Sequence, residues 1–237
     1  MQYKKIYSLI LSLVTVSATP SFAGVVVLAE VPEATKQLLA KAQALVQEHL
    51  KAINNQAKEE YLFEQGSYSP HMTLAYVSDK ELTMPELEEA EPKLGEHLAE
   101  LARATDLINM AEGIKESHLV VWPGKNESTY EGNKYKNYAI LVIKMKPSAQ
   151  LLQLVENIDK TLEKYPIALK REFPFSPHVT VGWLYDKKDI MPTPLVEAVK
   201  PTLEKLIAEF KSEQPFTIDS FKLSTHDKKQ VIYSLKK

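Results

Sequence analysis

One five-residue sequence occurs twice in this chain, as Ser-Pro-His-Met-Thr at residues 69–73 and as Ser-Pro-His-Val-Thr at residues 176–180. In each copy an aromatic residue, Tyr76 or Trp183, follows three positions after the threonine. The β-branched and aromatic residues from each histidine onward predict a strand. Because side chains alternate between the faces of a strand, each histidine shares a face with its threonine, and the mainly apolar opposite face is expected to pack on helices. The same alternation predicts that Tyr76 and Trp183 belong to the core.

The surroundings of the two motifs also repeat. The two histidines lie 107 positions apart (71 to 178), and the prolines that begin the following helices, Pro85 and Pro192, have the same spacing. A repeat in two copies predicts a pseudo-two-fold pair of lobes, and the order of its elements predicts an α+β fold with helices on the outer sheet faces. No linker divides the halves, so residues 24–237 are expected to form one domain. The predicted strands span 25–29, 107–112, 118–122, 138–143, 216–223 and 230–235, and the predicted helices span 33–53, 85–104 and 194–211, with another beginning at 147.

The composition excludes several classes of protein. A hydrophobic fraction of 44% and a charged fraction of 25% are typical of a soluble globular protein. The absence of cysteine excludes disulfides, a thiolate nucleophile and a cysteine-based zinc site. The formal net charge of −2 gives no overall attraction for nucleic acid, and we expect no DNA partner. Neither common pattern of glycine-rich phosphate loop is present.

Residues 1–23 are predicted to be a signal peptide. Lys4 and Lys5 precede an apolar run at residues 6–16, which is short for a transmembrane helix of about 20 residues. Ser21 and Ala23 are small residues at the −3 and −1 positions of a signal-peptidase site, so we expect cleavage after Ala23. The protein is therefore expected in the periplasm or secreted, with no stable membrane insertion after cleavage. An uncleaved N-terminal anchor is the alternative.

The two motifs together suit the chemistry of a phosphodiester. One imidazole can take a proton from an attacking hydroxyl or water while the other protonates the leaving oxygen, since an ordinary pKa of about 6.5 allows both forms near neutrality. The threonine hydroxyls can hydrogen-bond the non-bridging oxygens of the transition state. Because neither motif contains Asp or Glu, a carboxylate-rich magnesium site is not expected, and we predict no metal and no cofactor.

The two His-x-Thr strands resemble the signature of the 2H phosphoesterase superfamily, which includes 2′-5′ RNA ligase-like proteins and cyclic phosphodiesterases. The resemblance covers essentially the whole chain after residue 23. It implies a bilobal fold whose two antiparallel sheets line a central cleft, with metal-independent opening of a 2′,3′-cyclic phosphate or cleavage of a 2′-5′ linkage. It also implies that His71 and His178 are the acid/base pair and that Thr73 and Thr180 bind the phosphate. The near-symmetry of the motifs does not distinguish the acid from the base.

Substrate contacts outside the motifs are predicted at two places. The segment 122–137 is a polar loop with several lysines and tyrosines, where lysines can attract a phosphate and tyrosines can stack a base. A solvated hairpin loop is the alternative reading of that segment. The other place is just before the second motif. The candidates are Tyr130, Lys134, Tyr135, Arg171 and Phe175.

The sequence thus predicts an exported, monomeric phosphodiesterase. We expect it to hydrolyse 2′,3′-cyclic phosphates of small nucleotides or of RNA ends, by acid–base catalysis between two histidines. A 2′-5′ RNA ligase or 2′-5′ phosphodiesterase is the alternative among enzymes. A non-catalytic nucleotide- or phosphate-binding module is the alternative from another class.

Overall fold

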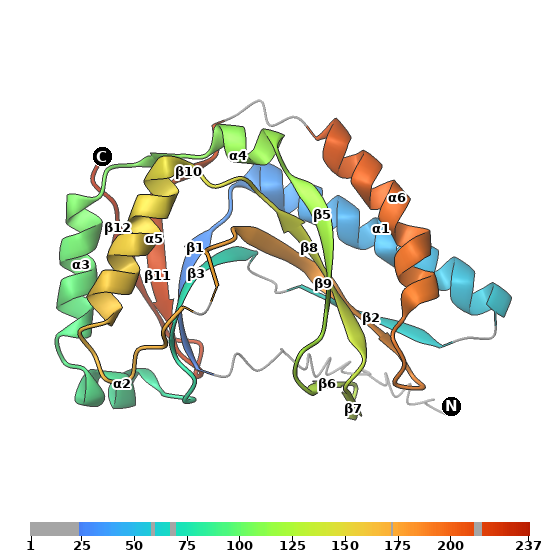
Figure 1. Cartoon of the computed structure of the whole chain (residues 1–237), viewed down its shortest axis with the longest axis horizontal. Coiled ribbons are helices and arrows are strands. Elements are labelled where there is room, and N and C mark those ends of the chain that lie inside the picture. The colour runs from blue at the N-terminus through green and yellow to red at the C-terminus, as the bar shows by residue number, and fades with distance from the viewer. Residues whose placement is uncertain (1–23, 58–59, 67–69, 172, 211–214) are drawn as a thin grey trace, which may run out of the picture.

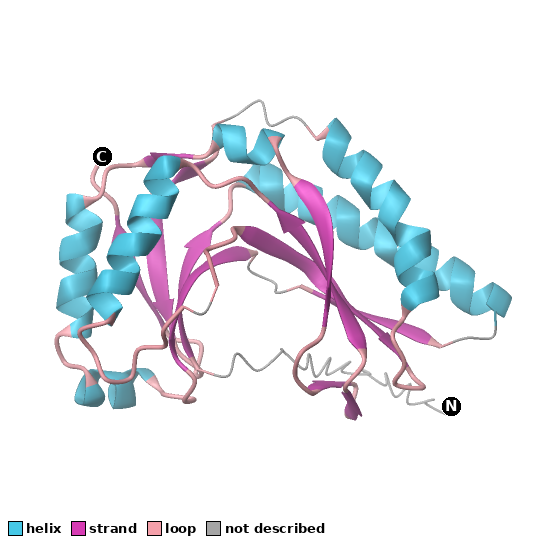
Figure 2. Cartoon of the chain, in the orientation of Figure 1, coloured by secondary structure: helices cyan, strands magenta, loops and turns pink. Residues whose placement is uncertain are grey.

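The computed structural model describes residues 24–57, 60–66, 70–171, 173–210 and 215–237. The predicted signal peptide and Ser69 of the first motif lie outside these ranges. Two four-stranded antiparallel sheets stand side by side and form an arch, with helices on its outer surface (Figures 1 and 2). The predicted α+β class with two antiparallel sheets and outer helices is confirmed.

The strands of the two sheets are shared between the halves of the sequence. Sheet I has the order β12-β11-β1-β3 and sheet II has the order β2-β9-β8-β5. In each sheet two strands come from one half of the chain and two from the other. Sheet I contains β1 (Val25–Glu30), β3 (His71–Ser78), β11 (Ser220–Ser224) and β12 (Gln230–Ser234), and sheet II contains β2 (Tyr61–Gln65), β5 (His118–Pro123), β8 (Tyr138–Lys144) and β9 (His178–Asp186).

The helices are exchanged in the same way. Helix α1 (Glu33–Ala57) follows a strand of sheet I but packs on sheet II beside α6 (Thr193–Glu209). Helix α5 (Ala149–Leu162) follows a strand of sheet II but packs on sheet I beside α3 (Leu94–Ala104). At the top of the arch the short strands β4 (Ile108–Asn109) and β10 (Thr217–Ile218), one from each half, pair with each other. None of the described helices has the length and apolar character needed to cross a membrane.

Three predicted elements are wrong in their extent, and two of the differences have a local reason. The helix predicted over 85–104 is two helices, α2 (Met84–Ala90) and α3, because Pro92 lacks a backbone N–H and disfavours helical geometry in the residue before it. The strand predicted over 107–112 ends at Asn109, whose side chain accepts a 2.9 Å hydrogen bond from the N–H of Ala111 and so begins α4 (Ala111–Lys115). The strand predicted over 216–223 is divided into β10 and β11.

Three strands and the short helix α4 were not predicted. Strand β2 forms the edge of sheet II, and the polar segment 122–137 contains a hairpin of β6 (Ser128–Tyr130) and β7 (Asn133–Tyr135). The hairpin matches the alternative reading of that segment. The helix expected to begin at 147 begins at Ala149, because Ser148 is its N-cap and accepts a 3.1 Å hydrogen bond from the N–H of Leu151.

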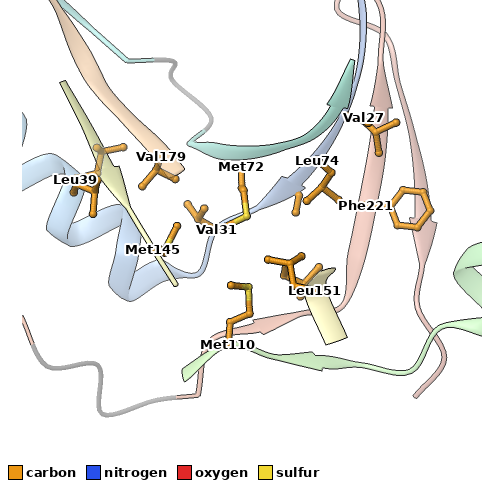
Figure 3. Close-up of a cluster of buried hydrophobic side chains, with 14 of the residues drawn as sticks. Val27, Val31, Leu39, Met72, Leu74, Met110, Met145, Leu151, Val179 and Phe221 are labelled. Carbon is orange, nitrogen blue, oxygen red and sulfur yellow. The ribbon is translucent and has the colours of Figure 1, made fainter. Parts of the chain in front are cut away.

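The apolar core lies between the sheets and their outer helices. Met72 and Leu74 of the first motif strand point into it together with Leu151 of α5 and Phe221 of β11 (Figure 3). Val179 of the second motif strand belongs to the same cluster. Full burial of such a side chain contributes about 1.5–3 kcal/mol, so the apolar face of each motif strand fixes the side on which its histidine and threonine emerge.

Candidate active site

The two motif strands meet where the sheets join. Strand β3 is the edge of sheet I, β9 is the second strand of sheet II, and the two contact each other in the middle of the arch (Figure 1). His71, Thr73, His178 and Thr180 are all half-buried on the face opposite the helices. Substrate can therefore reach them, while the surrounding protein shields them partly from water.

Each motif strand contains a β-bulge directly after its threonine. In the first, Leu28 lies opposite Thr73 and Val27 opposite Ala75, so one residue of β3 has no partner. In the second, Val142 and Leu141 of β8 lie opposite Thr180 and Gly182 in the same way. An extra residue in a strand inverts the alternation of side chains beyond it.

The bulges overturn the predicted positions of the two aromatic residues. Beyond its bulge each strand presents its aromatic residue on the face of the histidine and threonine. Tyr76 is 55% exposed and its hydroxyl is hydrogen-bonded to the side chain of Thr73. Trp183 is half-buried opposite Glu64 and Ile140. The expectation that Tyr76 belongs to the core is wrong. Trp183 does pack against a buried cluster, formed by Tyr135, Tyr138 and Tyr185, but this cluster lies on the sheet face of His178 and not on the opposite face.

The carbonyl groups freed at the bulges are bound by other parts of the chain. The carbonyl oxygen of Leu74 accepts a 2.6 Å hydrogen bond from Nη2 of Arg171. The same guanidinium group donates to Asp159, from Nε to Oδ2 at 2.8 Å and from Nη2 to Oδ1 at 3.0 Å. In the second strand the carbonyl oxygen of Val181 accepts from the N–H of Gly66 and from Nε2 of Gln43, both at 3.0 Å. These contacts hold the two bulges, and with them the orientation of the motif side chains.

Gly182 is required at the second bulge by the close approach of β2. A Cβ atom at this position would lie 2.4 Å from the carbonyl oxygen of Glu64 and 2.4 Å from the ring of Phe63, which is closer than real Cβ contacts allow. Glycine therefore lets the edge strand β2 pack against the bulge.

His178 is held in one orientation and one tautomer. Its Nδ1 donates a hydrogen bond to the carbonyl oxygen of Ser176 at 2.8 Å, because that oxygen can only accept. The ring of Trp122 lies edge-on to the imidazole, with centroids 4.6 Å apart. Nε2 is therefore the atom of the neutral ring that can accept a proton. The hydroxyl of Ser176 is buried and has no hydrogen-bond partner within the described part of the chain.

The environment of His178 favours its neutral form. Burial lowers the pKa of His178, the carbonyl group of Ser176 acts in the opposite direction, and the positive charges of His71 and Lys144 lower the pKa further. The influence of His71 also means that the two imidazoles lie within electrostatic reach of each other. The structure thus brings together the two histidines that the sequence places 107 positions apart.

The five other candidate residues make contacts of different kinds. Tyr130 stacks on Tyr185 with ring centroids 5.3 Å apart, and Tyr135 is buried against the same ring at 4.7 Å. Lys134 is exposed and pairs with Glu127 at 2.6 Å. Arg171 holds the first bulge and lies over the ring of Phe175, which is half-buried. Their role in substrate binding stays a prediction.

A buried carboxyl group on the motif face of sheet II was not anticipated from the sequence. Glu64 is 6% exposed, and its Oε2 accepts a 2.7 Å hydrogen bond from the hydroxyl of Tyr185, which lies 3.0 Å from the hydroxyl of Ser128. Its Oε1 has no partner among the described residues. No sequence signal marks Glu64, because its burial depends on the unpredicted strand β2. Among the described His, Asp and Glu side chains, no group of three or more is placed to hold a metal ion.

The Glu64→Gln variant is expected to be more stable than the wild type at neutral pH. Burial raises the pKa of Glu64, against the opposing effect of the Tyr185 hydrogen bond, so the folded protein binds this proton more tightly than the unfolded chain. The favourable contribution of Glu64 to the free energy of unfolding is therefore fully present at pH values below the ordinary pKa of 4.5. This contribution is lost as the pH rises through the pKa that Glu64 has in the folded protein. Urea denaturation at a series of pH values should show an advantage of the variant that disappears in acid. The exposed Glu89→Gln variant is the control, and an advantage independent of pH would contradict the explanation.

Comparison with known proteins returns remote structural neighbours. No protein-family model matches the sequence, and no curated protein sequence gives a significant match. Usb1 of Kluyveromyces marxianus is 13% identical, with a TM-score of 0.49 over 89% of this chain and 97% of Usb1. The same protein in a structure with uridine monophosphate is 15% identical over the same shares, with a TM-score of 0.44. E. coli LigT in complex with 3′-AMP is 15% identical, with a TM-score of 0.36 over 92% of this chain and 97% of LigT.

Proposed function

We propose that this protein is a 2H-type phosphoesterase that hydrolyses 2′,3′-cyclic phosphates of nucleotides or of RNA ends. The observation that carries the proposal is the meeting of two His-x-Thr pairs on one face of the molecule, with Nε2 of His178 available for proton transfer. Two imidazoles within electrostatic reach can serve as acid and base for the same phosphorus centre. The hydroxyl groups of Thr73 and Thr180 can donate hydrogen bonds to the phosphate oxygens that carry negative charge in the transition state.

In this reaction each motif contributes one proton-transfer group and one phosphate ligand. One histidine takes a proton from water as the water oxygen bonds to phosphorus. The other donates a proton to the ring oxygen whose bond to phosphorus breaks, giving a nucleoside monophosphate. Thr73 and Thr180 donate hydrogen bonds to the non-bridging oxygens, which hold the phosphate between the two sheets. No step of this scheme requires a metal ion.

The proposal extends to the location of the enzyme. Residues 1–23 would direct export and be removed after Ala23, so that the enzyme meets its substrate outside the cytoplasm. Mass spectrometry of the protein recovered from the periplasm or medium of an expressing bacterium should give a chain that begins at Gly24. A chain that retains residue 1 in the membrane fraction would contradict export with cleavage.

A product-resolved screen tests the function. Purified protein in EDTA is offered 2′,3′-cyclic nucleotides, cyclic-phosphate-ended RNA and 2′-5′ dinucleotides, and the products are separated by chromatography. Opening of the cyclic phosphates, with a bell-shaped pH dependence, is the expected result. Turnover of the 2′-5′ dinucleotides alone would replace the proposal by the alternative activity. Saturable binding of a nucleotide without turnover would point to a binding module instead.

A further inference from the structure

The two histidines have neighbours of opposite charge at equivalent positions. On β1, the neighbour of the first motif strand, Glu30 lies directly opposite His71. On β8, the corresponding neighbour of the second motif strand, Lys144 lies directly opposite His178. Glu30 and Lys144 are each the last residue of their strand, so they occupy equivalent positions in the two halves of the repeat. The neighbour of His71 is therefore a carboxylate, and the equivalent neighbour of His178 is an ammonium group.

Glu30 projects from the same sheet face as His71, and Lys144 projects from the same sheet face as His178. Directly opposed residues of antiparallel strands project to the same side, with Cβ atoms about 4.5–5.5 Å apart. A charge at this separation favours or disfavours the protonated imidazole according to its sign. The difference in charge between Glu30 and Lys144 therefore affects how readily each histidine is protonated.

Among the described residues, the two charged groups that shift the pKa of His178, those of His71 and Lys144, both disfavour its protonated form. Lys144 comes from the adjacent strand, and the positive charge of His71 comes from the facing sheet. His118, on the strand beyond Lys144, is exposed, and the Trp122 ring covers the imidazole without adding charge. Within the described part of the chain, the carbonyl oxygen of Ser176 acts in the opposite direction; it fixes the proton on Nδ1 and leaves Nε2 as the acceptor.

The first motif has the opposite arrangement. Glu30 is held ionised, since its hydrogen bond with Lys222 lowers its pKa against the effect of burial, and the charges of Lys222 and Lys36 lower it further. Lys222 is buried and belongs to β11, so that its backbone lies on the far side of β1 from His71. Strand β1, which carries Glu30, lies between the strands of Lys222 and His71. The carboxylate of Glu30 can therefore stabilise a protonated His71.

We propose that this difference assigns the two roles, with His178 as the general base and His71 as the general acid, and with Glu30 and Lys144 as the residues that position the two protons. The inference rests on the proposed function. Nε2 of His178 takes a proton from water as the O–P bond forms, and His71 donates a proton to the 2′ or 3′ oxygen as its bond to phosphorus breaks. The protonated His178 and neutral His71 then exchange protons with solvent, which restores the starting state.

A substrate with a leaving group that needs no proton distinguishes the acid from the base. The single His71→Ala and His178→Ala variants are compared on a 2′,3′-cyclic nucleotide and on a nucleoside p-nitrophenyl phosphodiester. We expect His71→Ala to lose activity on the cyclic nucleotide but to recover most of it on the p-nitrophenyl ester. His178→Ala is expected to lose activity on both. Equal losses on both substrates, or recovery by His178→Ala instead, would overturn the assignment.

Nuclear magnetic resonance titration of the two imidazoles tests the positioning residues without relying on turnover. In the wild type His71 is expected to titrate at higher pH than His178. Glu30→Gln should move the His71 titration to lower pH, and Lys144→Met should move the His178 titration to higher pH. Glu127→Gln and Lys160→Met remove the same charges elsewhere on the surface and serve as matched controls.

The outcomes separate this inference from the proposed function. If the wild type turns over neither substrate, the proposed function itself fails. If it turns over the cyclic nucleotide but His178 titrates above His71, or the two variants move neither titration, the division of roles fails while the phosphoesterase stands. A rise in KM of Lys144→Met with an unmoved titration would make Lys144 a phosphate ligand and would also overturn its proposed role.

Discussion

Alanine in place of His71 or of His178 is expected to lower kcat on a 2′,3′-cyclic nucleotide by about 10²- to 10⁴-fold, the usual contribution of a positioned acid or base. The two losses should not add in the double variant, because an acid and a base that act in the same step depend on each other. The measurement is single-turnover and steady-state kinetics in EDTA, with circular dichroism to verify that each variant is folded.

A histidine outside the motifs provides the control for this result. His49 lies on the outer helix α1 and is 3.3 Å from the hydroxyl of Thr202 on α6, so His49→Ala removes a histidine without touching the motif face. Its kcat should equal that of the wild type. A folded His71 or His178 variant that keeps the wild-type kcat would remove that residue from the chemistry.

Alanine in place of Phe221 is expected to lower the stability of the protein strongly. The ring is fully buried on the helix side of sheet I, in contact with the ring of Tyr233 at 5.3 Å. Loss of a buried aromatic ring of this kind lowers the free energy of unfolding by about 3–5 kcal/mol, through lost burial and the cavity that remains. Urea denaturation should show a lower midpoint with an unchanged slope.

The matched control is another phenylalanine that the structure leaves in solvent. Phe173 is 65% exposed, with the ammonium group of Lys125 over its ring at 5.0 Å. Its replacement by alanine should change the free energy of unfolding by no more than about 1 kcal/mol. If Phe173→Ala and Phe221→Ala were equally destabilising, the core described for sheet I would be incorrect.

The sequence predicted those features that depend on local pattern. The strands containing the motifs, the helices that follow them and the α+β class all rest on alternation, helical spacing and proline, which act over a few residues. The meeting of His71 and His178 could also be anticipated, because a repeat of this kind relates its two copies by symmetry. Tyr76 was misplaced because the bulge that turns it depends on pairing with β1, a strand distant in sequence.

The charged neighbours of the histidines could not be predicted for a related reason. Glu30 and Lys144 lie 41 and 34 positions before His71 and His178, and they oppose them only through the register of the sheets. Register depends on bulges, on the edge strand β2 and on the exchange of strands between halves, none of which has a sequence pattern of its own. The burial of Glu64 could not be predicted either, because it depends on the pairing of β2 with β9.

The exchange of strands also determines when this chain can finish folding. Val26 of β1 pairs with Ser224, which follows it by 198 positions, so β1 must wait for those residues to be made before its partner β11 exists. At a synthesis rate of about 5–20 residues per second, that delay is about 10–40 s. Throughout it β1 has no partner on the β11 side of sheet I. Strand β11 thus completes the side of β1 opposite His71, and this half of sheet I cannot form until a strand 198 positions further along the chain has been made.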